Sequence, residues 1–382
     1  MTLRKPIRLG MVGGGNDAFI GAVHRIAARI DGDYEFIAGA LSSTPEKAQA
    51  SGKALGLAPE RTYDDFKSMA MREARLKEGI EAVAIVTPNH MHAPVAREFL
   101  KRGIHVICDK PMTSTLTDAR KLVKTAEKSD ALFVLTHNYT GYPMVRQARE
   151  MITAGALGDI RVVQAEYPQD WLTEAEESHA NKQAEWRTDP ARSGAGGSVG
   201  DIGAHAFNLL GFVTGLETES LAADLQSFVP GRRLDDNAHV MLRFKGGARG
   251  LLWSSQVAPG NENALNIRIY GSKGGLEWAQ EDPNYLWFTP FGEAKRLITR
   301  GGNQAGSAAN RLTRTPGGHP EGYLEAFANI YAEAAAAIRA YSAGETAPPD
   351  VHFPSVYDGL AGVQFIDACV KSSQRNAAWV AF

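Results

Sequence analysis

The stretch Ile7-Arg8-Leu9-Gly10-Met11-Val12-Gly13-Gly14-Gly15 decides the expected fold, because a short apolar run ends there in three consecutive glycines. A helical pattern follows at Gly21–Ile30, and a second apolar run follows at Glu35–Leu41. Glycines between a strand and a helix allow a tight turn in which backbone N–H groups approach a pyrophosphate. The spacing Gly13-x-Gly15-x-x-Ala18 matches the dinucleotide-binding pattern, and the flanking elements favour that interpretation over a plain glycine-rich turn.

Short apolar strands continue to alternate with helical patterns up to about residue 140. Apolar strands that do not alternate with polar residues indicate a parallel sheet covered on both faces, as in a doubly wound nucleotide-binding domain. Further strands are expected at Ala82–Val86, His105–Cys108 and Leu132–Thr136, and further helices at Thr44–Leu57, Ala93–Lys101 and Leu116–Ser129.

The pattern changes after residue 140 to consecutive strands with glycine-rich turns, which indicates a large and mostly antiparallel sheet. We therefore expect an α/β protein with a Rossmann domain over residues 1–140 and a substrate-binding and oligomerisation domain over residues 141–382. The last helix, Ser355–Ser372, would then be able to pack back on the first domain. The other elements expected here are helices at Met144–Ile152, Asp201–Val213 and Glu321–Tyr341, strands at Ile160–Tyr167, Val240–Phe244, Gly250–Gln256, Asn266–Tyr270, Gly275–Trp278 and Tyr285–Phe288, and a glycine-rich loop at 292–318.

The composition is that of an ordinary globular enzyme, with 382 residues, 44% hydrophobic residues and a net charge of −2. The near-neutral charge gives no electrostatic reason to expect a nucleic acid or an anionic membrane as a partner. No apolar run reaches the length of about 18 residues that a membrane span needs, and no leader pattern is seen. We expect a cytoplasmic protein in which Cys108 and Cys369 are buried free thiols.

The end of the second strand bears on the choice of cofactor. An acid at this place normally binds the ribose 2′-OH and repels a 2′-phosphate. The chain has Leu41-Ser42-Ser43-Thr44 there instead, and Lys47 is the nearby cation. NAD and NADP therefore both remain open. The expected cofactor contacts in this half of the domain are Gly13, Gly15, Asn16, Phe19, Ile20, Ser42, Ser43 and Lys47.

Four motifs occur in an order that resembles the glucose–fructose oxidoreductase, inositol dehydrogenase and rhizopine-catabolism (Gfo/Idh/MocA) family. They are the glycine loop with Gly21-x-x-His24, then Thr87-Pro88-Asn89-His90-x-His92, then Cys108-Asp109-Lys110-Pro111, and finally Gly196-Gly197-Ser198-Val199-Gly200-Asp201-Ile202-Gly203-Ala204-His205. The resemblance covers nearly the whole chain. The chain departs from the family in having extra residues between Gly15 and Gly21, and in having Asp109 where Glu is usual.

The resemblance implies a role for particular residues. Lys110 matches the active-site lysine, with a cis peptide bond expected before Pro111. Asp201 and His205 match the pair that faces the substrate, and their i, i+4 spacing places them on one helix face. A homodimer or homotetramer that packs through the open sheet is also implied. The segment that lines the nicotinamide side of the cofactor matches Thr87, Pro88, Asn89, His92, Asp109 and Lys110.

Oxidation of a carbinol needs a hydride acceptor and a base, and a base works best with a pKa near the operating pH. This favours His205 as the base, Asp201 as its partner and Lys110 as a hydrogen-bond donor to the reacting oxygen. The reverse assignment of His205 and Lys110 stays open. Asp201 as a helix cap and His205 as a core histidine are the structural alternatives. We expect no metal site at His90-x-His92, because no cysteine or acid lies nearby.

The substrate contacts are expected at Tyr139, Trp171, Arg187 and His319, near family-matched positions. Carbohydrate sites often stack a sugar ring on an aromatic side chain, which makes Trp171 a candidate, although a core or interface role is an equal alternative. His319 precedes a helix, and Glu321 beside it has the alternative role of serving the helix dipole.

Three functions follow. The first is an NAD(P)-dependent dehydrogenase or reductase of a sugar, inositol, polyol or glycoside. The second is a glycosidase that oxidises its substrate transiently, eliminates the aglycone and reduces the sugar again with a retained cofactor. The third is a cofactor-sensing regulator, which has no need of the proton-transfer groups Lys110, Asp201 and His205.

Overall fold

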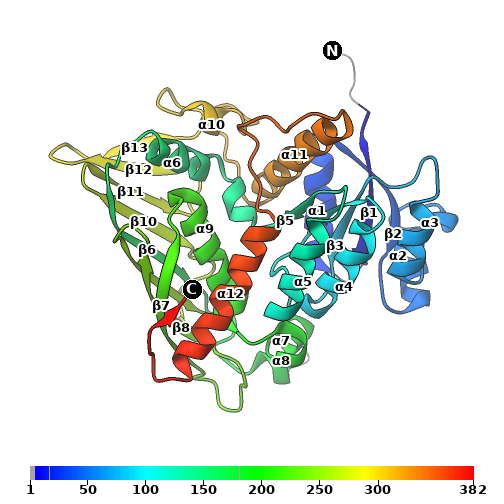
Figure 1. The fold of residues 1–382 in the computed structure, drawn as a ribbon, viewed down its shortest axis with the longest axis horizontal. Helices are drawn as coiled ribbons and strands as arrows, with labels where there is room; N and C mark the ends of the chain where they lie inside the picture. Colours follow the sequence, from blue (N-terminus) through cyan, green and yellow to red (C-terminus); the bar gives the residue numbers. More distant parts are fainter. Residues whose placement is uncertain (1–4, 17, 180) are drawn as a thin grey trace. The chain divides into compact units, whose positions relative to one another are not determined.

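The computed structural model describes residues 5–16, 18–179 and 181–382, and its elements follow one another as Figure 1 shows. The chain divides into two compact units, and each contains one sheet. The first unit also takes up residues 323–360, which the sequence-based division at residue 140 places in the second domain. The first unit contains the described residues up to Thr113, Thr117–Gly141 and Tyr323–Leu360, and the second contains Ser114–Leu116, Tyr142–Gly322 and Ala361–Phe382.

The sheet of the first unit is parallel, with the order β2-β1-β3-β4-β5 among the described residues. All residues of β3 and β4 are buried, as expected for short apolar strands covered on both faces. The strand order reverses beside β1, and ligands of such sheets bind where this reversal occurs. The strands are β1 Ile7–Gly13, β2 Tyr34–Ala40, β3 Ala82–Val86, β4 His105–Cys108 and β5 Phe133–Leu135.

The helices of the first unit include one from the far end of the sequence, α11. Its Tyr331 hydroxyl lies 2.8 Å from Nδ1 of the buried His24 on α1, and its Tyr331 carbonyl accepts a hydrogen bond from the Tyr34 hydroxyl. Helix α11 therefore packs against α1 and the start of β2. The helices are α1 Phe19–Ile30, α2 Pro45–Ala54, α3 Phe66–Glu73, α4 Asn89–Leu100, α5 Leu116–Ala126 and α11 Tyr323–Ser342, while α12 Val356–Ser373 has residues in both units.

The sheet of the second unit has the order β13-β12-β11-β10-β6-β9-β8-β7-β14 in the described residues. Its strands pair antiparallel except for β6 with β9, which confirms the expected large and mostly antiparallel sheet. The strands are β6 Ile160–Pro168, β7 Thr218–Gln226, β8 Asn237–Phe244, β9 Arg249–Ser255, β10 Asn266–Gly271, β11 Gly274–Ala279, β12 Tyr285–Pro290, β13 Arg296–Thr299 and β14 Val380–Ala381.

Helices α6 Pro143–Thr153 and α9 Ala204–Thr214 cover one face of this sheet (Figure 1). On the other face, apolar side chains such as Met241 and Leu251 are 48% and 50% exposed. The expected loop at 292–318 contains β13 and the short helix α10 Ser307–Asn310. No helix in the described ranges is long and apolar enough to cross a membrane.

Candidate active site

The glycine loop after β1 has the close approaches that a dinucleotide site needs. Gly13 and Gly14 have φ of 79° and 70°, a left-handed conformation that favours glycine. A Cβ on Gly21 would lie 2.5 Å from the Cα of Gly14, so helix α1 touches the loop backbone. The N-cap residue of α1 is Ala18, whose side chain makes no capping hydrogen bond. These features fit a pyrophosphate bound at the start of the helix.

The other loop residues differ in their exposure. Asn16 donates its backbone N–H to the hydroxyl of Ser51, which also lies where a Cβ on Gly15 would sit. Ile20 is half-buried, whereas the Phe19 side chain is 71% exposed. At the end of β2, Ser43 and Lys47 are exposed and Ser42 is half-buried.

Two turns at the carboxyl ends of β3 and β4 are tied together by a buried histidine. Nε2 of His92 lies 2.8 Å from the carbonyl oxygen of Thr87, and Nδ1 lies 2.7 Å from that of Pro111. The Lys110–Pro111 bond is cis, as expected. His92 is only 1% exposed, and both of its ring nitrogens contact backbone carbonyl oxygens of these turns. Pro88 is half-buried, and Asn89 is buried at the start of α4.

Asp109, Lys110 and one histidine that the motifs did not single out lie close together. Asp109 accepts hydrogen bonds from the Lys110 backbone and from the Thr136 hydroxyl, at 2.9 and 3.1 Å. Burial, and then the positive charge of Lys110, lower the pKa of His137 to about 3. His137 is therefore neutral near the lysine. His137 stands just after β5, at the carboxyl edge of the sheet, and this position in the sequence could have predicted it as a site residue.

Tyr139 follows in a short 3-10 helix, Asn138–Gly141, and is only 4% exposed. Cys108 and Cys369 are both buried free thiols, as expected, and burial raises the pKa of each well above its usual value.

In the second unit, Asp201 lies within a π-helical turn, Val199–Gly203, that leads directly into α9. Oδ2 of Asp201 accepts hydrogen bonds from Nε2 of Gln256 at 3.0 Å and from Nε of Arg187 at 3.2 Å. Its carboxylate is thus paired with two side chains. Gln256 is a contact of this site that the motifs did not predict. It stands two residues after the buried Ser254 on β9, and this spacing indicates that both side chains point to the same face of the sheet.

His205 follows one turn later on α9 and is 7% exposed. Its ring centroid lies 6.4 Å from that of Tyr167 on β6. His205 is therefore largely covered, within the same helical segment as Asp201.

Two predicted substrate residues lie in the cluster around Asp201. The guanidinium carbon of Arg187 is 4.3 Å from the ring centroid of Trp186 and 5.9 Å from that of Trp171. Trp171 is half-buried and donates a hydrogen bond to Gln169. The structure thus brings Trp171, Arg187 and Asp201 together from separate parts of the sequence.

The fourth predicted substrate residue, His319, lies on an exposed loop of the second unit. Its carbonyl oxygen accepts hydrogen bonds from Arg300 and Thr315. Glu321 is buried, pairs with the buried Arg300 at 3.0 Å and accepts the backbone N–H of Thr315.

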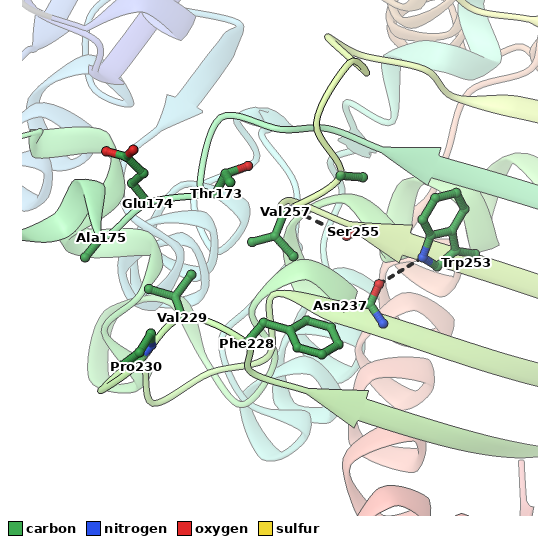
Figure 2. Close-up of a pocket in the computed structure, with 11 residues that line it drawn as sticks. Thr173, Glu174, Ala175, Phe228, Val229, Pro230, Asn237, Trp253, Ser255 and Val257 are labelled. Atoms are coloured by element: carbon green, nitrogen blue, oxygen red, sulfur yellow. Dashed lines mark hydrogen bonds between the residues drawn. The ribbon is translucent and has the colours of Figure 1, made fainter.

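A separate cavity of about 670 Å³ lies on the other face of β9 (Figure 2). Trp253 and Asn237, joined by a hydrogen bond of 2.9 Å, lie at one end and Glu174 at the other. Ser255 and Val257 also line it, and these residues flank Gln256 in the sequence. Because side chains alternate along a strand, the cavity and Asp201 lie on opposite faces.

Comparison with known proteins identifies the family. Residues 7–137 match the model of an oxidoreductase family with an NAD-binding Rossmann fold, and residues 145–277 match the GFO/IDH/MocA C-terminal domain. An oxidoreductase from Sinorhizobium meliloti is 65% identical, with a TM-score of 0.91, over 99% of this chain and all of that one.

Two further relatives span the chain at lower identity. An inositol dehydrogenase homolog from Azotobacter vinelandii, in complex with NADH and myo-inositol, is 35% identical, with a TM-score of 0.92, over 99% of this chain and 98% of that one. An uncharacterized oxidoreductase of Bacillus subtilis (strain 168) is 35% identical over the whole chain and 98% of its own length. Together with the glycine loop and the two-unit fold, these matches show that the chain belongs to the Gfo/Idh/MocA family of NAD-binding oxidoreductases.

Proposed function

We propose that this enzyme transfers a hydride between NAD(P) and a carbinol carbon of a sugar, an inositol or other polyol, or a glycoside. The observation that carries the proposal is the cluster of Asp201, Arg187, Gln256 and Trp171, which combines charged, amide and aromatic groups beside His205 on one helical segment. Such a mixture suits a neutral, hydroxyl-rich substrate. The myo-inositol bound by the Azotobacter vinelandii homolog belongs to this class.

The nicotinamide ring, when bound, accepts or donates the hydride. We propose that His205 takes the hydroxyl proton as the general base. Asp201, which accepts hydrogen bonds from Arg187 and Gln256, stabilises the imidazolium that forms. Lys110 donates a hydrogen bond to the reacting oxygen and stabilises its negative charge.

The cofactor contacts divide into three groups in this proposal. The N-terminus of α1 holds the pyrophosphate, the end of β2 holds the adenosine ribose, and the two turns joined by His92 hold the nicotinamide side. The choice between NAD and NADP stays open, because the end of β2 carries no acid in Leu41-Ser42-Ser43-Thr44. The residues are Gly13, Gly15, Asn16, Phe19 and Ile20 for the first group, Ser42, Ser43 and Lys47 for the second, and Thr87, Pro88, Asn89, His92, Asp109 and Lys110 for the third. Tyr139, Trp171, Arg187 and His319 are the proposed substrate contacts.

The test replaces His205 and Lys110 separately with alanine. Each change is expected to lower kcat by about 10²–10⁴-fold, while the Kd for NAD+, measured by fluorescence titration, stays at the wild-type value. Lys101→Ala, at an exposed position, is the matched control and should leave both quantities unchanged. Wild-type turnover in either active-site variant would refute the assigned roles.

The same assay separates the dehydrogenase from the redox-cycled glycosidase. A dehydrogenase accumulates reduced nicotinamide with a sugar or polyol, whereas the glycosidase releases an aglycone without added NAD+ and without accumulating NADH.

We also propose that a second copy of the chain covers the exposed apolar face of the large sheet, giving a homodimer or homotetramer. The cytoplasmic location stays a prediction.

A further inference from the structure

One buried carboxylate accepts hydrogen bonds from the segment that leads to Asp201. The N–H of Gly197 donates to Oδ1 of Asp235 at 2.7 Å, and the N–H of Val199 donates to Oδ2 at 2.8 Å. Between them, the N–H of Ser198 donates to the backbone oxygen of Asp235, also at 2.8 Å. Three consecutive amides therefore end on one residue.

These amides stand at the start of the helical segment that carries Asp201 and His205. The first N–H groups of a helix have no carbonyl partner within it, so they need acceptors from elsewhere. A carboxylate at this end is also favoured by the helix dipole. Asp235 thus caps the start of this helix from another part of the chain. The sequence pattern had offered Asp201 as an alternative for this role.

Asp235 is itself held firmly. The next residue, Asp236, is fully buried, accepts the backbone N–H groups of Phe228 and Val229, and pairs with Arg232 at 3.2 Å. Arg232 also binds both carboxylate oxygens of Glu177 at 3.0 Å.

The segment fits closely against this support. A Cβ on Gly197 would lie only 2.0 Å from the carbonyl oxygen of Asp235, so there is no room for a side chain at this position. The hydroxyl of Ser198 lies 3.2 Å from that of Ser254 on β9, two residues before the Gln256 that binds Asp201. Ser254, which contacts the start of the helix, and Gln256, which contacts the Asp201 carboxylate, are therefore two residues apart in the chain.

We propose that Asp235 is a positioning residue, which holds the start of this helix so that Asp201 and His205 reach their working geometry. The proposal rests on the catalytic roles proposed above, and Asp235 acts only through the backbone of residues 197–199. A displacement of about 1 Å in a catalytic group is enough to lower a rate by about 10²-fold.

The pKa of the Asp235 carboxyl makes the effect of these hydrogen bonds testable by a change of pH. Burial raises the pKa of Asp235 to about 6, although the hydrogen bonds from Val199 and Gly197 lower it. The facing charged and titratable groups are Asp236, which is paired with Arg232, and Cys369 on α12, whose thiol stays protonated. Below about pH 6 a proton on one oxygen therefore removes an acceptor from one of the two amides.

The first measurement is hydrogen exchange of residues 197–199, which needs neither substrate nor cofactor. In the wild type, protection of these amides is expected to fall about tenfold between pH 7 and pH 5, after correction for the intrinsic exchange rate. In Asp235→Asn the amides are expected to exchange at least tenfold faster at pH 7, with the pH dependence abolished. Asp130→Asn, at an exposed position between α5 and β5, is the matched control and should behave as wild type.

The second measurement is steady-state kinetics with NAD+ and a panel of myo-inositol, levoglucosan and D-glucose. Asp235→Asn is expected to lower kcat by about 10–100-fold and to leave the Kd for NAD+ unchanged. Faster exchange with an unchanged kcat would overturn the positioning role, and so would unchanged exchange. If Asp235→Asn does not fold, a pH-independent exchange pattern in the wild type overturns it. Changed exchange in a protein that oxidises no polyol or sugar would instead count against the proposed function, because the contact would exist without the reaction.

Discussion

Replacing Gly21 with alanine tests how the start of α1 supports the cofactor loop. The added Cβ would lie 2.5 Å from both Cα and the carbonyl oxygen of Gly14, where an ordinary contact is 3.4–4 Å. Because both obstacles are backbone atoms, helix and loop have to separate by about 1 Å. Such overpacking costs about 1–3 kcal/mol, and the better helix propensity of alanine returns up to about 1 kcal/mol. We expect a net loss of about 1–2 kcal/mol in the free energy of unfolding.

The loop that moves is the one proposed to hold the pyrophosphate, so the Kd for NAD+ should rise about tenfold or more, which corresponds to about 1.4 kcal/mol. Urea unfolding and fluorescence titration with NAD+ measure the two effects. Gly211→Ala in α9 is the matched control, because a Cβ there meets nothing within 4 Å. It should gain about 0.4–1 kcal/mol of stability and bind NAD+ normally. If Gly21→Ala behaves like Gly211→Ala in both assays, the close approach of helix and loop does not exist.

Two further outcomes are expected. Ser42→Asp places an acid at the end of β2 that repels a 2′-phosphate, so the ratio of KM for NADP+ to KM for NAD+ should rise about tenfold; an unchanged ratio in steady-state kinetics would show that Ser42 does not face the ribose. Burial lowers the pKa of His105 to about 4, although Glu81 raises it, and its Nδ1 accepts the N–H of Leu132. Because the unfolded chain binds the proton at about pH 6.5, this stability is present above pH 6.5 and is lost as the pH falls towards 4, at up to about 1.4 kcal/mol per pH unit. His105→Asn keeps an acceptor without the titration, so urea unfolding at several pH values should give it a shallower slope than wild type, and equal slopes would contradict this reasoning.

Much of the first unit was predictable because its signals are local. Buried strands such as β3 and β4 appear as short apolar runs, and the positive φ of Gly13 and Gly14 follows from the turn that a strand and a helix must make there. The edge strands β13 and β14 were not predicted individually. They have only four and two residues, which is too short for an alternating pattern to stand out.

The packing of α11 on α1 was not predictable from the helical pattern either. Both C-terminal helices have apolar faces, and the pattern does not say which sheet each face covers. His24 and Tyr331, which make the contact, are separated by 307 positions in the chain.

The sequence by itself determined the fold class, the glycine loop and the motifs that contain Lys110, Asp201 and His205, because each depends on residues within a few positions of one another. Only the tertiary structure decided the partners of those residues. Arg187 and Gln256 reach Asp201, and Asp235 caps the helix that carries it, from three other segments. The physical reason is that a buried carboxylate or amide must be satisfied by whichever group folding brings within about 3 Å, and no local spacing records that choice.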